Sequence, residues 1–115
     1  EVRRVLFGAD VFAYPSTWPE TSCLCLIEAM CAGLACVHSS LGALPETSMS
    51  LTHMYGYTED REDHVELLTD YLRFTIDEVR SGKGDLETQA RLANREYDWS
   101  LRAEEWKTLL SSLAG

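Results

Sequence analysis

The first half of the chain alternates short apolar runs with turn-forming residues. Residues 11–14 and 35–38 are apolar almost throughout, which is typical of strands buried on both faces of a parallel sheet. Between them the pattern predicts a helix that is capped by Thr21 or Ser22 and ends just before Gly33. A strand, a helix and a strand joined by short turns form one βαβ unit with a right-handed crossover.

The second half of the chain is predicted to be helical, after one weak strand candidate near residues 53–57. A long helix starts at about Asp60 and ends at Gly82, and two more follow over residues 86–97 and 99–113. Apolar residues recur at helical spacing along the long helix and the last helix, and such apolar stripes normally face a core. The stripe of the long helix is Val65, Leu68, Leu72, Ile76 and Val79, and that of the last helix is Trp99, Ala103, Trp106, Leu110 and Leu113.

The fold class is therefore α/β, with about three parallel strands, flanking helices and a helical C-terminal end. The 115 residues suffice for a single domain, in which residues 9–57 form the βαβ core and residues 58–115 the helical part. Three strands make a thin sheet, so we expect a partial Rossmann-like unit.

The charge of the chain is strongly acidic. Its 10 basic and 19 acidic residues give a net charge of −9, which repels a phosphate backbone and disfavours nucleic acid as a partner. No apolar run approaches the roughly 18 residues that a membrane-spanning helix needs. We take the acidic residues as solvated helix faces.

Four cysteines lie within or beside one apolar stretch, at Cys23, Cys25, Cys31 and Cys36. Their spacing fits no zinc pattern, so buried free thiols in a reducing compartment are the simplest interpretation. We accordingly expect a cytoplasmic protein, with peripheral membrane association of a longer enzyme as an alternative.

The junction between the first strand and the first helix is the best candidate for a binding site. In open α/β sheets, ligands bind outside the carboxyl ends of the strands. The first N–H groups of a helix lack internal partners and carry partial positive charge, which suits phosphate oxygens. The small polar residues Thr21 and Ser22 permit close approach to the backbone. Every βα junction has these free N–H groups, so on their own they are weak evidence for a binding site.

Two glutamates flank this junction. Glu28 lies inside the apolar helix run, about 9 Å along the helix from a cap at Ser22. A buried carboxylate there needs donors, which the vicinal hydroxyls of a ribose supply; the alternative is a solvent-facing Glu28 bound to water or an arginine. Glu20 can accept from sugar hydroxyls or stabilise positive charge at an anomeric carbon. Its alternative role is a favourable anion near a helix N-terminus.

Residues 9–46 closely resemble the retaining GT-B glycosyltransferases of family 4, the group 1 glycosyltransferases. The resemblance covers an Ala-Asp-strand-Pro-Ser lead-in, the E-x7-E pair Glu20 and Glu28, a Glu-Ala-Met helix centre and a Gly-Ala-Leu-Pro-Glu loop. Residues 97–100 are more loosely similar to the family's closing helix. The chain departs from the family at residues 21–23, Thr-Ser-Cys, where many relatives carry Gly-Phe-Gly.

The resemblance implies that the chain is the second half of a GT-B C-terminal domain that binds a nucleotide-diphosphate sugar. Glu20 would contact the donor sugar as the catalytic residue, and Glu28 would hold the ribose. No metal and no cofactor is expected, because relatives stabilise the leaving diphosphate with cationic side chains and helix dipoles. Backbone amides at Thr21, Ser22, Cys23 and Leu24 would meet the sugar and phosphate, and Gly42, Ala43, Leu44 and Glu46 would border the pocket.

The same resemblance implies a missing N-terminal acceptor domain as a partner. We expect the longer enzyme to be of the hexosyltransferase type, and the 115-residue chain to be inactive alone. The strand Val11–Tyr14 would be an uncovered edge, through which we expect a homodimer. The alternative is a non-catalytic Rossmann-like binding or interaction module, or a degenerate remnant. A response regulator is disfavoured, because the required aspartate and lysine are not in place.

Overall fold

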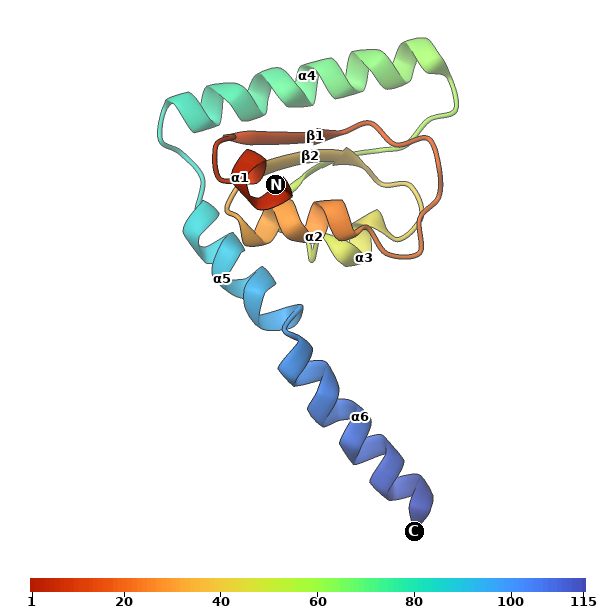
Figure 1. Cartoon of the computed structure of the whole chain (residues 1–115). Helices are drawn as coiled ribbons and strands as arrows, with labels where there is room; N and C mark the ends of the chain where they lie inside the picture. Colours follow the sequence, from red (N-terminus) through yellow and green to blue (C-terminus); the bar gives the residue numbers. More distant parts are fainter.

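The computed structural model describes residues 1–115 and confirms the α/β fold (Figure 1). The chain forms three strands and six helices in the order that the pattern predicts, with a short helix added at the start and another after the second strand. The elements are α1 (Val2–Leu6), β1 (Val11–Tyr14), α2 (Leu24–Cys31), β2 (Ala35–Ser39), α3 (Leu44–Thr47), β3 (His53–Tyr55), α4 (Arg61–Arg80), α5 (Leu86–Glu96) and α6 (Trp99–Ala114).

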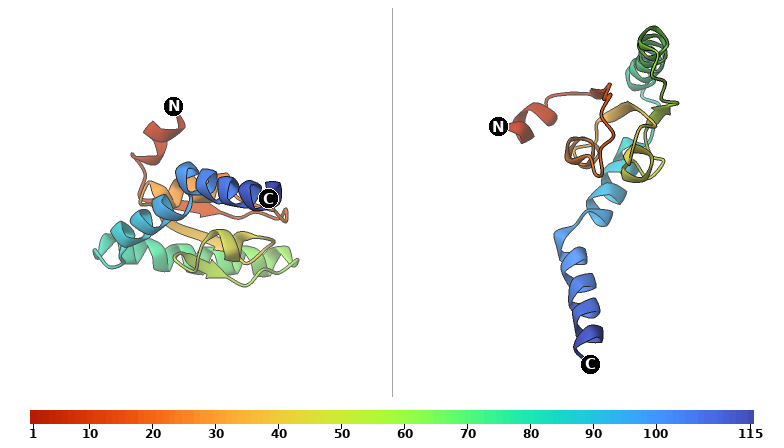
Figure 2. Two further views of the ribbon diagram at one scale, coloured as in Figure 1. Left: turned by 90° about the horizontal axis from the view of Figure 1, so that it is seen from below. Right: turned by 90° about the vertical axis from the view of Figure 1, so that its right-hand side faces the viewer.

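The three strands form an open parallel sheet in the order β1-β2-β3. Val11 is in register with Ala35, and Val37 with His53. Helix α4 runs along one face, whereas α2 covers the other face with α5 beside it (Figures 1 and 2). β2 is buried along its whole length, as the central strand of such a sheet must be.

The main core lies between α2, β2 and α5. Ala29 of α2 and Ala93 of α5 are fully buried, and their small side chains allow the two helices to approach closely. The side-chain amide of Gln89 donates to the Leu34 carbonyl oxygen at 2.8 Å, which ties α5 to the turn before β2. The core cluster consists of Cys23, Leu26, Ala29, Met30, Leu34, Cys36, Leu44 and Ala93.

The interface between α4 and the sheet is more polar than the stripe on α4 predicts. The buried side chains of α4 are His64 and Thr75, whereas Val65 of the expected stripe is 56% exposed. His53 Nδ1 lies 2.5 Å from the Thr75 hydroxyl, and the Tyr55 hydroxyl lies 2.9 Å from His64 Nε2. These polar contacts join α4 to β3. Of the apolar stripe, Ile76 and Val79 lie beside Val11 at the β1 edge of the sheet.

Helix α6 projects away from the body of the molecule (Figure 1). The expectation that its stripe packs within the chain is wrong, because Trp99 is 85% exposed and α6 buries no residue. The 3.6-residue period predicts an amphipathic helix but not what covers it. None of the helices is both long and apolar enough to cross a bilayer.

The four cysteines are free, as predicted, but only Cys23 and Cys36 are buried. Cys31 is partly exposed and Cys25 is exposed. The expectation of four buried thiols is thus wrong for Cys25 and only partly met at Cys31, because α2 turns position 25 outward while Leu26 faces the core.

Candidate functional site

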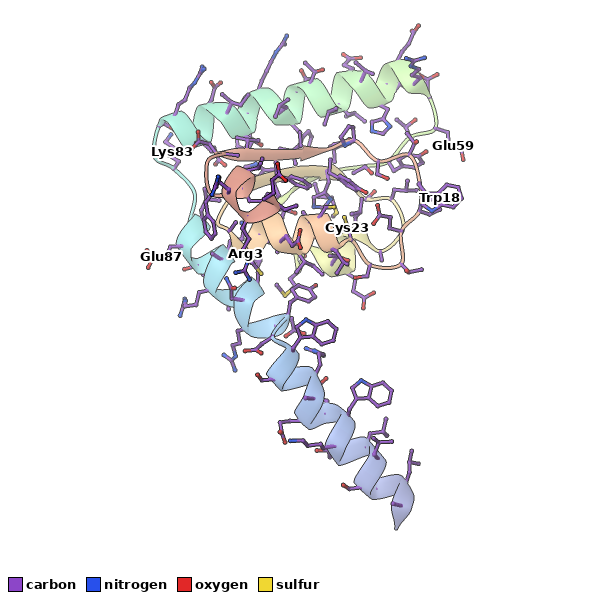
Figure 3. The ribbon with its side chains drawn as sticks, in the orientation of Figure 1. Arg3, Trp18, Cys23, Glu59, Lys83 and Glu87 are labelled. Carbon is purple, nitrogen blue, oxygen red and sulfur yellow. The ribbon has the colours of Figure 1, made fainter.

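All the candidate residues except Glu28 gather at the carboxyl edge of the sheet, where β1 leads into α2 and β2 leads into α3. In Figure 3, Cys23 lies at the start of α2, and Trp18 projects outward from the preceding loop. Glu59 lies toward the same edge, whereas Lys83 lies at the opposite one. This is the edge at which open parallel sheets bind ligands.

The start of α2 differs from the prediction. The N-cap is Cys23, not Thr21 or Ser22, and no side chain caps the helix. Cys23 is buried in the core and its backbone is extended. The helix therefore begins at the next residue, Leu24. Thr21 and Ser22 are exposed in the loop. They remain available to a ligand but do not shape the helix end.

The first turn of α2 presents backbone donors to solvent. The first intrahelical bond runs from the Ile27 N–H to the Cys23 carbonyl oxygen at 3.1 Å. The N–H groups of Leu24 and Cys25, which precede it, have no partner in the protein, and both residues are exposed. Together with the helix dipole, these two groups suit an anionic oxygen.

Glu20 is held through both its side chain and its backbone. The Tyr14 hydroxyl donates to Oε1 of Glu20, and the Ala43 N–H donates to the Glu20 carbonyl oxygen at 2.9 Å. Gly42 lies directly against the same residue, since a Cβ atom there would stand 2.8 Å from the Glu20 carbonyl oxygen and 2.9 Å from its nitrogen. The structure thus brings the loop after β2 together with Glu20.

Tyr14 is a site residue that the sequence reasoning missed. It is the last residue of β1, so its side chain emerges at the carboxyl edge, and this position was the signal that could have found it. The hydrogen bond to Glu20, with partial burial adding, raises the pKa of the Tyr14 phenol. Burial, and to a lesser degree the Glu20 charge, raise the pKa of the Cys23 thiol. Both groups are therefore protonated near neutral pH.

The loop after β2 contributes its residues in different ways. Gly42 has a φ of +57° and Ala43 contacts Glu20 through its N–H, so both lie at the candidate site. Leu44 belongs to the core and is 1% exposed, so its side chain is not accessible to a ligand. Glu46 is exposed in the first turn of α3.

Glu28 lies on the outer face of α2. The helix turns Leu26, Ala29 and Met30 into the core and position 28 outward, so the expectation of a buried carboxylate is wrong. Its carboxylate forms no hydrogen bond or ion pair within the chain. It lines a cavity of about 430 Å³ between α1, α2 and α5, to which the Glu20 loop contributes no residue. The other lining residues are Val2, Arg3, Leu6, Phe7, Ile27, Cys31, Ala32, Asn94 and Tyr97.

A second hollow lies at the carboxyl edge, on the α4 side of the sheet. It has a volume of about 320 Å³ and is formed by the loops after β1 and β3 and by the first turns of α4. Sequence reasoning overlooked these residues, although those that follow β3 reach the same edge as Glu20. The lining residues are Pro15, Thr17, Tyr57, Thr58, Glu59, Arg61, His64, Val65 and Leu68. No group of three or more His, Cys, Asp or Glu side chains could hold a metal ion.

Comparison with known proteins identifies the class to which this edge belongs. The sequence profile described as "Glycosyl transferases group 1" matches residues 1–74, from α1 into α4. The chain belongs to this family of group 1 glycosyltransferases. The matched range includes Tyr14, Glu20, Glu28 and Gly42, and it ends before α5 and α6. A search among curated proteins finds no match.

Proposed function

We propose that the chain supplies part of the donor site of a retaining GT-B glycosyltransferase of family 4, with a nucleotide-diphosphate sugar as the donor. Membership of the group 1 family supports the class of reaction. The observation that carries the site is the Glu20 carboxylate, which Tyr14 and the Gly42 loop hold at the carboxyl edge beside the uncapped start of α2. A cytoplasmic location belongs to the same proposal, since all four cysteines are free thiols.

Each group has one role in this proposal. The N–H groups of Leu24 and Cys25 receive the oxygens of the diphosphate, whose negative charge grows as the sugar leaves. Glu20 accepts from hydroxyls of the donor sugar and stabilises the positive charge that develops at its anomeric carbon. Glu28, further along the same helix, accepts from the ribose hydroxyls; its exposed and unpaired carboxylate is free to do so. No metal or cofactor takes part.

The chain would bind a donor but would not transfer the sugar alone. Transfer requires an acceptor held in line with the anomeric carbon, and positioning of this kind supplies a large part of an enzyme's rate. We assign the acceptor platform to a separate N-terminal domain of the parent enzyme. Residues 9–57 then form the donor-binding part, and residues 58–115 support it.

Titration calorimetry tests this proposal. UDP-glucose, GDP-mannose and the free nucleoside diphosphates are titrated into the wild-type chain and into Glu20→Gln, Glu28→Gln and Glu66→Gln. Glu66 is exposed on α4 and lines neither the Glu28 cavity nor the hollow at the carboxyl edge, so its variant is a charge-matched control. We expect Glu28→Gln to weaken sugar nucleotides and diphosphates alike, Glu20→Gln to weaken sugar nucleotides only, and Glu66→Gln to change neither. A wild-type chain that binds none of the ligands contradicts the proposal.

One observation favours a second function, that of a non-catalytic binding module. Glu28 opens into the mostly apolar cavity between α1, α2 and α5, to which the Glu20 loop contributes nothing. A module that uses only that cavity would bind its ligand independently of Glu20. Ligand binding that Glu28→Gln weakens and that Glu20→Gln leaves unchanged, for sugar nucleotides as well as for diphosphates, favours this second function.

A further inference from the structure

The end of β1 places a phenol next to the carboxylate at the centre of the candidate site. The Tyr14 ring stacks on Phe12, with ring centroids 5.8 Å apart and planes inclined by 12°. Both rings pack against the core cluster beneath α2. The Tyr14 hydroxyl is therefore carried by a ring that the core holds in place, and it donates to Oε1 of Glu20.

The backbone of Glu20 is fixed independently of this hydrogen bond. Its carbonyl oxygen accepts from the Ala43 N–H at 2.9 Å, and Gly42 leaves no room for a shift of the Glu20 backbone toward the loop after β2. With the backbone fixed, the direction of the carboxylate depends on the side-chain torsions alone. The phenol removes that remaining freedom, because it restrains one of the two oxygens.

We propose that Tyr14 is a positioning residue for Glu20, whose carboxylate it aims so that its second oxygen faces the donor sugar. This inference rests on the proposed function and deepens it. The Tyr14 hydroxyl has a fixed position because its ring packs against the core, which a donor free in solvent does not have. Tyr14 itself touches no reacting atom. Its effect on the sugar passes entirely through Glu20.

Loss of the Tyr14 hydroxyl should weaken binding of the donor sugar, which Glu20 contacts, and leave binding of the diphosphate unchanged. Tyr14→Phe keeps the stacked ring and removes only the hydroxyl, so the fold is preserved while the carboxylate is released. We expect the affinity for a sugar nucleotide to fall at least about tenfold, in line with the loss of one hydrogen bond to a charged group. The affinity for the corresponding nucleoside diphosphate, which lacks the sugar, should remain unchanged.

The first arm of the test needs no ligand. The tyrosines are labelled with carbon-13 at Cζ, the Tyr14 resonance is assigned by its loss in Tyr14→Phe, and the phenols are titrated in the whole 115-residue chain. We expect Tyr14 to titrate at higher pH than an exposed tyrosine and to return toward the ordinary range in Glu20→Gln. Tyr57→Phe serves as the control and should leave the Tyr14 resonance in place. A Tyr14 resonance that Glu20→Gln does not change overturns the pairing.

The second arm uses calorimetry with UDP-glucose, GDP-mannose, UDP and GDP on the wild type, Tyr14→Phe, Glu20→Gln and the double variant. We expect Tyr14→Phe to weaken only the sugar nucleotide, and to have no further effect once Glu20 is glutamine. Equal losses for sugar nucleotide and diphosphate, or additive losses in the double variant, overturn the positioning role. Wild-type binding that Tyr14→Phe leaves unchanged overturns this inference alone. Absence of any wild-type binding overturns the proposed function and the role of Tyr14 with it.

Discussion

His38 shows, at the scale of a single residue, how hydrogen-bond partners fix a protonation state. The side chain is fully buried in β2, with Nδ1 2.8 Å from the Ser39 carbonyl oxygen and Nε2 2.6 Å from the Thr52 hydroxyl. Because a carbonyl oxygen only accepts, Nδ1 carries the proton and Nε2 accepts from Thr52. The neutral imidazole thus satisfies both partners, and burial lowers the pKa of His38.

This residue makes the stability of the chain depend on pH. The unfolded chain binds a proton at His38 below about pH 6.5, whereas the folded chain does so only at lower pH. The contribution of His38 to stability is therefore present above that pH and is lost as the pH falls through it. Urea unfolding between about pH 5 and pH 8 should show a shallower loss of stability on acidification for His38→Asn than for the wild type. Identical slopes would contradict the neutral assignment.

The geometry of the candidate site depends on a glycine at position 42, which lies directly against the backbone of Glu20. Gly42→Ala introduces a strained positive φ of +57° and places Cβ 2.8 Å from the backbone of Glu20. Gly82 has a φ of +65° but open space around it, so Gly82→Ala isolates the cost of the strained conformation, about 1 kcal/mol. We expect Gly42→Ala to lose more, about 2 kcal/mol or above, in chemical unfolding. Equal losses in the two variants would show that Gly42 does not abut Glu20.

Local sequence signals explain which parts of the site could be predicted. Glu20, Glu28 and the Gly42 loop lie in a continuous pattern of strand, helix and turn, so the sequence places them on the correct elements. The roles assigned to them remain predictions. The contacts of Glu20 with Tyr14 and Gly42 depend on how two loops fold over each other, which no periodicity encodes. The outward direction of Glu28 follows from the packing of Leu26, Ala29 and Met30 into the core, which an unbroken apolar run does not reveal.

At the scale of the elements, local signals predicted β1, α2 and β2 well, and each later helix close to its observed bounds. The start of α2 was missed because a buried Cys23, rather than a polar cap, determines where the helix begins. The buried face of α4 was missed because Thr75 and His64 bond to His53 and Tyr55 on β3. The spacing of apolar residues along a helix does not predict hydrogen bonds between polar side chains that are distant in the sequence.

The start of α4, in contrast, is encoded locally. Asp60 Oδ1 accepts from the Glu62 N–H at 2.9 Å and from the Asp63 N–H at 3.0 Å, which satisfies two donors that a helix leaves free. We expect Asp60→Ala to lower the free energy of unfolding by about 1 kcal/mol in urea denaturation. Asp70→Ala, at an exposed position within the same helix, removes the same charge and should change it by less than about 0.5 kcal/mol. Equal effects would assign the loss to charge rather than to capping.

At the scale of the whole molecule, two apolar surfaces remain uncovered. One is the stripe of α6, which projects from a body that it does not touch broadly (Figure 1). The other is the β1 edge of the sheet, where the strand is only partly buried and where Ile76 and Val79 of α4 lie beside Val11. Sequence periodicity identified both as apolar. The resemblance to the family predicted the uncovered β1 edge, whereas the exposure of the α6 stripe was not predicted.

The β1 edge is the surface on which we base a prediction of self-association. The Ala35 N–H donates to the Asp10 carbonyl oxygen at 3.0 Å, so alternation along the strand turns the backbone groups of Val11 and Ala13 toward the open side. Such unpaired groups, flanked by apolar side chains, can pair with the same edge of a second copy. The net charge of −9 on each chain opposes this contact, so added salt should strengthen it.

Light scattering over a range of concentrations measures this directly. We expect the apparent mass of the wild type to rise toward a dimer with increasing concentration, and Ala13→Lys to suppress the rise, because a lysine on an edge strand blocks edge pairing. Glu66→Gln changes the net charge by the same amount on the outer face of α4 and should still associate. A variant that ends at Asp98 tests α6 in the same way. If it stays monomeric while Ala13→Lys still dimerises, the stripe of α6 rather than β1 is the contact.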